Sequence, residues 1–470
     1  MDRDRYIQQA FDEHLGDANV YKPLTERDAN NIQQKLKYQV NSFISTHVNS
    51  EAETIYLRGA MKKFPTKHSR FYMTLKAHKQ PVKMRPIVST SGTFMSALSK
   101  WLDYWLQQLK PFVPTYIKDS FDLQQKLTDL GPLPPNALIF IADAVLMYTN
   151  INTDHGLQVI SWWLDELEPQ LPNNFPIKGV KVALKLVMEN NVFEFGDKWF
   201  LQLLGTAMGT PAAVMYATLY YAWWEKTTLI PKYQQQLKLL RRFIDDMFGI
   251  WLWDPNNLPV WEEFKRDLNS FGILRWEVKE PGKRVDYLDL TIEIVGDKIV
   301  TRTYQKELNL YLYIPPHSAH PIENIRGAVH GLMRRYKQQN TEESDYIKMV
   351  ILLFRRLAAR GWDRMQLKQL LLEVHNNIKN NKKRPRSDDP PIDSHERLIL
   401  HFEYHPCDIP RKKIRHIYKK HCAKLEEDSN LGIQQMIVAY SRPTNLRDAI
   451  TRAKLHQAPG REASTFGGGR

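Results

Sequence analysis

The chain has 470 residues, of which 43% are hydrophobic and 11% aromatic, and its formal net charge is +14. The length allows roughly two to four domains with at least one large core, and the composition excludes a mainly disordered chain. The two cysteines, Cys407 and Cys422, are too few for a disulfide framework and suit a reducing compartment. The excess of Lys and Arg favours a polyanionic partner, most simply nucleic acid.

The N-terminal part predicts a helix and contains no secretory signal, because the chain is charged from its second residue. The letters TERD at Thr25 are typical of a helix N-terminus. Ile32, Leu36, Val40 and Phe43 then recur at helical spacing. We therefore expect the first helix to begin at Thr25.

A long uncharged segment, Trp199 to Trp224, is long enough to span a bilayer. It contains Gln202, three threonines, two glycines and Pro211 near its middle. This polarity favours a buried strand or loop followed by a core helix over a membrane span. We expect no membrane partner.

The middle of the chain reads as strands and loops. Residues 71–135 mix short strand-like pieces with basic loops, and Ala137 to Ala142 predict a buried strand that ends at Asp143. Gly249 to Trp253 predict another strand, paired with the one before Asp245.

After about residue 315 the pattern becomes helical. Gly361 is expected to end one helix, and Asp363 with Gln366 to cap the next. Asn376 to Ser394 have the composition of a linker, and a small basic region follows. One helix face is predicted by Ile347, Val350, Ile351, Phe354, Leu357 and Ala358.

Two adjacent aspartates interrupt the apolar stretch RRFIDDMFGIWLW, Arg241 to Trp253. Asp245 and Asp246 are flanked by strand-forming residues, as in a β-hairpin with polar residues at its tip. Such a tip can be an ordinary surface turn, since Asp favours turns. It can also form one wall of a metal site, because hard divalent cations take carboxylate oxygens together with substrate phosphates. Asp143, at the end of a buried strand, is the natural second wall.

Six blocks of the chain resemble, in family order, the reverse transcriptases of Penelope-like retroelements. FIDDMF is similar to the Y-x-D-D hairpin of reverse transcriptases, and DAVLMYTNI at Asp143 to the segment D-x-x-S-L-Y-T-N-I-P. GTAMGTPAAVMYATLYYAWWE at Gly205 is similar to G-T-A-M-G-T-x-x-A-P-x-Y-A-N-L. The remaining blocks are FYMTLKAHKQPVKMRPIVSTSGT, DYLDLTIE and AYSRPTNLRDAITRAKL, and together the six span residues 71–455.

The resemblance implies an α+β protein with the fold of a right-hand polymerase, related to telomerase, that copies an RNA template into DNA. The expected palm contains an antiparallel sheet and the expected thumb is helical. The implied parts are an N-terminal helical extension (1–70), fingers (71–135), a palm (136–300, with a fingers insertion at about 155–200), a thumb (301–380), a linker (381–396) and a basic C-terminal region (397–470).

The resemblance also assigns roles by position. Asp143 and Asp245 would hold two Mg²⁺ ions, with Mn²⁺ as the alternative, and Asp246 would be a secondary catalytic carboxylate. Tyr148 would lie under the incoming sugar and exclude a 2′-hydroxyl, although a core tyrosine is the competing interpretation. The residues expected at the deoxynucleotide are Lys76, Arg85, Tyr148, Gly205, Gly209 and Thr210. Lys279 and Lys283 are equal candidates for the acid that protonates pyrophosphate.

Template RNA and a DNA primer would be bound mostly through phosphate contacts. The solvated face of an ordinary helix is the competing interpretation for each basic cluster. The expected nucleic-acid contacts are Lys79, Arg334, Arg335, Arg411, Lys412, Lys413, Arg415 and Lys419. Lys382 to Arg386 resemble a nuclear localisation signal. The spacing of His405, Cys407, His416, His421 and Cys422 matches no standard zinc finger.

The chain departs from the family in several places. Phe243 replaces the usual Tyr of the hairpin, and Ala144 and Leu146 alter the loop before Tyr148. No GIY-YIG endonuclease motif follows the last block, so we expect a fragment or an endonuclease-lacking member, with a separate nuclease as a candidate partner. Two other functions stay open. One is an inactive nucleic-acid-binding protein with a polymerase fold, and the other is a reverse transcriptase of the telomerase or group II intron type.

Overall fold

The computed structural model describes residues 3–64, 67–76, 83–255, 258–307, 309–318, 320, 322–380, 397–405, 407–428 and 435–441. The chain divides into two compact units, with the boundary between residues 308 and 309. Residues 381–396 of the predicted linker, including the signal-like run Lys382 to Arg386, and Lys79 lie outside the described residues. The predicted start of the linker at Asn376 is wrong, because residues 376–379 still belong to the helix Arg364–Lys379.

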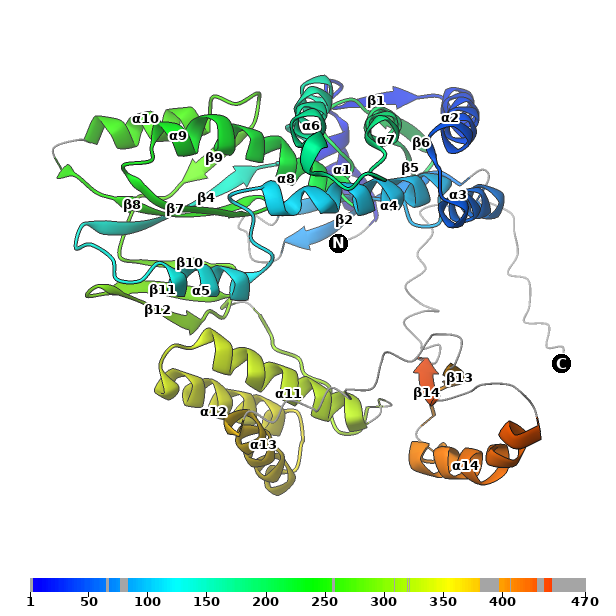
Figure 1. The fold of residues 1–470 in the computed structure, drawn as a ribbon, viewed down its shortest axis with the longest axis vertical. Coiled ribbons are helices and arrows are strands. Elements are labelled where there is room, and N and C mark those ends of the chain that lie inside the picture. Colours follow the sequence, from blue (N-terminus) through cyan, green and yellow to red (C-terminus); the bar gives the residue numbers. More distant parts are fainter. Residues whose placement is uncertain are drawn as a thin grey trace. The chain divides into compact units, whose positions relative to one another are not determined.

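The helices of the first unit lie around its sheets (Figure 1). Its α-helices are α1 (Arg3–Ala10), α2 (Glu26–His47), α3 (Glu51–Lys63), α4 (Phe94–Leu106), α5 (Ser120–Asp129), α6 (Thr153–Leu167), α7 (Ile177–Glu189), α8 (Ala213–Trp224), α9 (Ile230–Lys232) and α10 (Leu258–Leu268). Short π- or 3₁₀-helical segments are η1 (Phe11–Leu15), η2 (Gln107–Phe112), η3 (Glu168–Gln170) and η4 (Glu225–Leu229).

Three sheets belong to the first unit. The five-stranded sheet has the order β1 (Tyr21–Leu24), β6 (Lys198–Gln202), β5 (Val192–Phe195), β2 (Ser69–Lys76), β3 (Lys83–Ser89). The four-stranded sheet has the order β7 (Leu237–Phe243), β8 (Asp246–Leu252), β4 (Ala137–Val145), β9 (Arg275–Val278). The three-stranded sheet consists of β10 (Arg284–Tyr287), β11 (Leu290–Val295) and β12 (Lys298–Thr303).

The four-stranded sheet is antiparallel throughout and buries both faces. Phe140 on one face packs on Trp261 and Phe264 of α10. On the other face, Phe248 contacts Tyr287, which precedes the β10–β11 turn. Figure 1 shows the same arrangement, with α8, α9 and α10 on one side of the sheet and α5 with β10–β12 on the other. Burial of both faces explains why its strands read as nearly continuous apolar runs.

The second unit begins with a bundle of three helices, α11 (Ile322–Gln339), α12 (Glu343–Ala359) and α13 (Arg364–Lys379). Their shared core includes Met333, Tyr346, Leu353, Leu371 and Val374. Further along the chain, β13 (Arg397–Glu403) and β14 (Gln435–Ser441) pair in parallel. The helix α14 (Arg411–Asp428) lies between them in sequence, as a parallel crossover requires.

The α+β class predicted for a right-hand polymerase is confirmed, with an antiparallel sheet in the expected palm region and a helical bundle after it. The predicted helix N-terminus at Thr25 is also confirmed, because the Thr25 hydroxyl accepts the backbone N–H of Asp28 at 3.1 Å. Contrary to the prediction, it is not the first helix, because α1 and η1 precede it. Gly361 follows α12 with φ +92°, and Asp363 caps α13 by accepting the N–H of Gln366. The uncharged segment forms β6, a loop and α8, as predicted.

Two other local predictions are wrong. Within residues 94–129, α4, η2 and α5 form in place of the expected strand-like pieces and loops. The signal for α4 was present in the sequence, because its exposed residues Lys100 and Tyr104 recur at helical spacing opposite nine buried residues. In α12, Ile347 and Ile351 are 38% and 46% exposed, while Tyr346 and Leu353 are buried. The apolar stripe of α12 is wider than the face that α11 and α13 cover.

In the part of the chain that the structure describes, no helix combines the length and the apolar character needed to cross a membrane.

The close packing of β8 on β4 gives a stability prediction. A Cβ at Gly249 would overlap the ring of Phe140, which is fully buried. Gly249→Ala should therefore lower the free energy of unfolding by about 1–3 kcal/mol, measured by urea denaturation. Gly59→Ala is the control, because Gly59 lies inside α3 with open space around it and should gain about 0.5–1 kcal/mol. An unchanged midpoint for Gly249→Ala would contradict the tight contact.

Candidate active site

The β7–β8 hairpin places the aspartate pair at the edge of the four-stranded sheet. Phe243 pairs with Asp246, so Ile244 and Asp245 form the two-residue turn. Ile244 has φ +58°, in the left-handed region that a β-branched residue rarely adopts. Such strain persists only where the surroundings hold the backbone in place, and it is frequent at functional sites.

Asp143 lies directly across from Asp246, as the antiparallel register of β4 and β8 requires. The backbone N–H of Ala144 donates to the carbonyl of Asp245 at 2.9 Å and ties the turn to β4. Side chains directly opposite in an antiparallel pair have Cβ atoms about 4.5–5.5 Å apart. The structure thus brings together the three carboxylates that the sequence analysis singled out from distant parts of the chain.

The charges of the three aspartates act on one another. Burial, together with the neighbouring carboxylates of Asp245 and Asp143, raises the pKa of Asp246 to about 6, while Lys306 opposes the shift. Two like charges opposite each other in a sheet are destabilising. The site therefore favours a positive group that could bind between these carboxylates.

No group of three or more His, Cys, Asp or Glu side chains among the described residues is arranged to hold a metal ion. The donor set at the hairpin is nevertheless of the kind that Mg²⁺ takes, namely carboxylate oxygens on rigid backbone. The Asp143–Asp246 pair and the adjacent Asp245 fit such an ion in chemistry and charge.

A buried ion pair that the sequence analysis missed lies beneath the hairpin. Arg242 and Glu225 are 1% and 0% exposed, and Arg242 Nε donates to Glu225 Oε1 at 2.6 Å. Arg242 Nη1 donates to the carbonyl of Ile244 at 2.7 Å. A signal was present in the sequence, because Arg242 shares the alternating phase of the buried Leu240 in β7.

Tyr287, inside the block DYLDLTIE, supports the turn from the other face of the sheet. Its hydroxyl donates to the carbonyl of Asp246 at 2.8 Å, and its ring lies 5.4 Å from that of Phe248. Asp245 thus lies between Ile244, whose carbonyl accepts from buried Arg242, and Asp246, whose carbonyl accepts from buried Tyr287.

Tyr148 lies near the carboxylates and packs against the main core. Burial raises its pKa to about 12, with Asp245 adding to the shift and Arg85 opposing it. The side chain of Tyr148 therefore lies within electrostatic reach of the predicted metal ligand and of the predicted triphosphate ligand. Arg85 itself is exposed on β3.

The loop from Gly205 to Pro211 is bound to two neighbouring segments. Thr206 N–H donates to the carbonyl of Tyr148 at 2.7 Å, and a Cβ at Gly205 would overlap that same oxygen. Gly209, with φ +122°, lies so close to Val88 that a Cβ would be 2.6 Å from its carbonyl oxygen. Glycine is required at both positions for the loop to reach β3 and the Tyr148 turn together.

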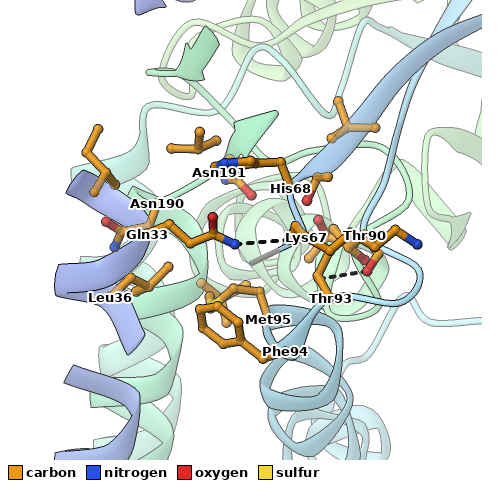
Figure 2. A pocket seen from close by; sticks show the side chains of 16 residues that line it. Gln33, Leu36, Lys67, His68, Thr90, Thr93, Phe94, Met95, Asn190 and Asn191 are labelled. Carbon is orange, nitrogen blue, oxygen red and sulfur yellow. Dashed lines mark hydrogen bonds between the residues drawn. The ribbon is translucent and has the colours of Figure 1, made fainter. Parts of the chain in front are cut away.

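Thr210 lines a cavity on the side of this loop toward α2 (Figure 2). The figure shows Gln33 and Lys67 joined by a hydrogen bond, and Asn190 and Asn191 also line the cavity. The hydroxyl of Thr210 is buried and makes no hydrogen bond to the described residues. The predicted nucleotide contact of Thr210 stays a prediction.

The other predicted residues are placed as follows. The side chain of Lys76 is outside the description, although its backbone ends β2. Lys283 Nζ donates to the carbonyls of Pro135 and Ala137, which lie about 20 Å along β4 from Asp143. Lys283 is therefore too far to protonate pyrophosphate at the carboxylates, whereas Lys279 bonds to Ile141 through its backbone N–H.

The predicted nucleic-acid contacts of the second unit are exposed on two helices. Arg334 and Arg335 lie on α11, and five cationic side chains lie on α14, namely Arg411, Lys412, Lys413, Arg415 and Lys419. These five side chains thus lie on one helix. Its role in binding stays a prediction.

No protein-family model matches the sequence, and no curated protein matches it. Among solved structures, the chain is similar to telomerase from Candida albicans in complex with the TWJ fragment of telomeric RNA, at 10% identity and TM-score 0.48, over 67% of this chain and 61% of that one. It is similar to the corresponding complex from Candida tropicalis at 10% identity and TM-score 0.40, over 72% and 66%. A third is the BmCPV RNA-dependent RNA polymerase at its elongation state, at 11% identity and TM-score 0.43, over 68% and 29%.

The raised pKa of Asp246 predicts that the free energy of unfolding of the metal-free protein depends on pH. Its pKa is raised from 3.8 to about 6 in the folded state, so stability falls as pH rises from about 4 to about 6 and stays reduced above. Asp246→Asn should raise the free energy of unfolding at pH 7.5 by about 1–3 kcal/mol and change it little at pH 3.5.

Thermal unfolding with a chelator at both pH values tests this prediction. Asp165→Asn is the control, since Asp165 is an exposed partner of Lys181 and should have little effect at either pH. Equal stabilisation by Asp246→Asn at both pH values would contradict an electrostatic origin.

Proposed function

We propose that the chain is an RNA-directed DNA polymerase of the Penelope-like retroelement type, which adds deoxynucleotides to a primer 3′-hydroxyl with two Mg²⁺ ions. The observation that carries this proposal is the β4–β8 register, which sets Asp143 opposite Asp246 beside the turn at Asp245. The sequence blocks that contain these three residues are the ones that resemble the family. Mg²⁺ commonly binds one or two carboxylates together with substrate phosphates, and this site supplies the carboxylates.

In this mechanism the protein positions the reactants, since phosphoryl transfer depends mainly on positioning and charge stabilisation. Asp143 and Asp245 would hold the ions, which supply activation of the 3′-hydroxyl and charge neutralisation at the triphosphate. Asp246 adds negative charge next to both ligands and, as the first residue of β8, fixes their spacing. The strained residue Ile244 directly precedes Asp245 in the two-residue turn.

The nucleotide side of the site would be formed by Tyr148, Arg85 and the glycine loop. The planar guanidinium of Arg85 suits a phosphate, and its exposure on β3 leaves it accessible. The ring of Tyr148 is held by the core on one side, which would let it act as a rigid wall under the sugar. Gly205 and Gly209 hold the loop close to Tyr148 and to β3 at once.

Template RNA and DNA primer are the proposed polymeric partners. The net charge of +14 and the exposed cations of α11 and α14 favour binding through phosphates. The chain spans 61% and 66% of the two telomerase chains it resembles and 29% of the viral polymerase. The activity, substrates and partners of the whole protein are accordingly part of this proposal.

Primer extension on an RNA template with deoxynucleotides and Mg²⁺ tests the activity. Asp143→Asn and Asp245→Asn should each lower kcat by about 100-fold or more, because each loses several kcal/mol of transition-state stabilisation. Asp165→Asn should retain full activity, as its carboxylate is exposed on α6.

Three results would overturn the proposal or part of it. Extension that persists in Asp245→Asn would exclude this metal site. Binding of the template–primer without any extension by the unmodified chain would favour the inactive nucleic-acid-binding protein instead. Extension on an RNA template that is restricted to telomeric repeats would favour the telomerase-type alternative.

If the ring of Tyr148 lies under the incoming sugar, Tyr148 should set the preference for deoxynucleotides over ribonucleotides. Tyr148→Val should reduce the preference for deoxynucleotides over ribonucleotides by about 10- to 100-fold in kcat/KM, because the ring that meets the 2′-hydroxyl is gone. Tyr148→Phe is the matched control, since it keeps the ring and loses only the hydroxyl. Equal discrimination in Tyr148→Val and in the unmodified chain would assign Tyr148 to the core alone.

A further inference from the structure

The Arg242–Glu225 pair is a closed network inside the core. The two arginine–carboxylate bonds are 2.6 and 3.0 Å long, and the hydroxyl of Thr115 donates to the same carboxylate. Both charged side chains are almost completely buried. Removing such charges from water carries a large desolvation penalty, so a buried ion pair is weak evidence of a stabilising role.

One end of the network is the two-residue turn that contains Ile244 and Asp245. Besides Glu225, the guanidinium donates to the carbonyl of Ile244 at 2.7 Å and to the carbonyl of Thr218 at 2.8 Å. Ile244 is the strained residue of the turn and directly precedes Asp245. The arginine therefore holds in place the one peptide group whose orientation decides where the Asp245 side chain points.

The other end of the network is the helix that follows the glycine loop. Thr218 lies in α8, and Glu225 begins η4, a π-helical segment that directly continues α8. π-helical turns inside helices are frequent at functional sites, because the inserted residue turns side chains to new directions. One guanidinium thus joins the turn that carries Asp245 to the helix that carries the proposed nucleotide loop.

We propose that Arg242 and Glu225 are positioning residues, which fix the metal-binding carboxylate of Asp245 relative to α8 and the loop at Gly205 to Pro211. This inference rests on the proposed function, because it assumes a divalent cation at Asp143 and Asp245. The pair touches neither metal nor substrate and acts through the backbone of Ile244. Outer residues that orient ligands in this way typically change metal affinity or activity by about 10- to 100-fold when replaced.

Two variants separate positioning from simple stabilisation. The first is an apolar triple variant, Thr115→Val, Glu225→Met and Arg242→Met, which removes every charge of the network together. Replacing a buried ion pair by apolar residues of similar volume is often neutral or stabilising, so this variant should fold. The second is Arg242→Lys, which keeps the charge but loses the planar fork that reaches three partners.

Arg241→Met is the matched control. Arg241 is the neighbouring arginine of β7, and it bonds the carbonyls of Pro114 and Leu240 rather than the turn. Asp245→Asn is the reference for loss of the metal ligand itself.

Mn²⁺ binding by electron paramagnetic resonance is the deciding measurement, since it needs no turnover. The apolar triple variant should bind Mn²⁺ about 10- to 100-fold more weakly than the unmodified chain while unfolding at a similar temperature. Its kcat in primer extension should fall by a similar factor, with a smaller change in the KM for the template–primer. Arg242→Lys should show the same direction, and Arg241→Met should match the unmodified chain.

The outcomes are distinguishable. If Asp245→Asn abolishes Mn²⁺ binding while both network variants, measured below their unfolding temperatures, bind within twofold of the unmodified chain, the positioning role is overturned and the proposed function stands. If Asp245→Asn leaves Mn²⁺ binding unchanged, the metal site itself is wrong. If only the stability changes in the network variants, the pair is structural.

Discussion

The antiparallel pairing of β4 with β8 is the interaction on which the rest of the site depends. A shift of this register by one residue would turn every side chain of β8 to the other face of the sheet. Asp246 would then point into the apolar layer under α10, and Phe248 would lose its contact with Tyr287. Burial on both faces of the sheet therefore fixes the register and, with it, the place where Asp143 meets the hairpin.

Several residues of the site adopt conformations or surroundings that are unfavourable for their residue type. Two carboxylates face each other, a β-branched residue occupies the left-handed region, and an arginine is buried beside a glutamate. Each feature lowers stability when considered alone, and such features persist where the surrounding core holds them. Here the core consists of α8 and α10 on one face of the sheet and the β10–β12 sheet on the other. The proposed cation would relieve the first of these conflicts, because it replaces repulsion between carboxylates with attraction to a shared ion.

The glycine loop connects the two sides of the proposed chemistry. Its N–H groups bond to the Tyr148 turn, its glycines lie against β3, and the helix that follows it ends on the Arg242–Glu225 pair. A displacement of α8 would therefore move the hairpin turn through the hydrogen bonds of Arg242 to Thr218 and Ile244, and not only through apolar packing. This continuity is the physical reason to treat the loop, Tyr148 and the aspartates as one site.

The sequence alone determined the features that depend on neighbours along the chain. It gave the helix start at Thr25, the end of α12 at Gly361, the strand before Asp143 and the hairpin at Asp245, because caps and alternating apolar residues are local signals. It led us to expect strand-like pieces where α4 forms, although Lys100 and Tyr104 mark an exposed stripe of α4 at helical spacing. It missed the exposed face of α12, since only the packed neighbours decide which part of a wide apolar stripe is covered. The proximity of Asp143 to Asp246 was suggested by resemblance and decided by the strand register. The pairing of Arg242 with Glu225 and of Tyr287 with Asp246 was decided by tertiary structure alone, because the partners lie 17 and 41 positions apart in the chain.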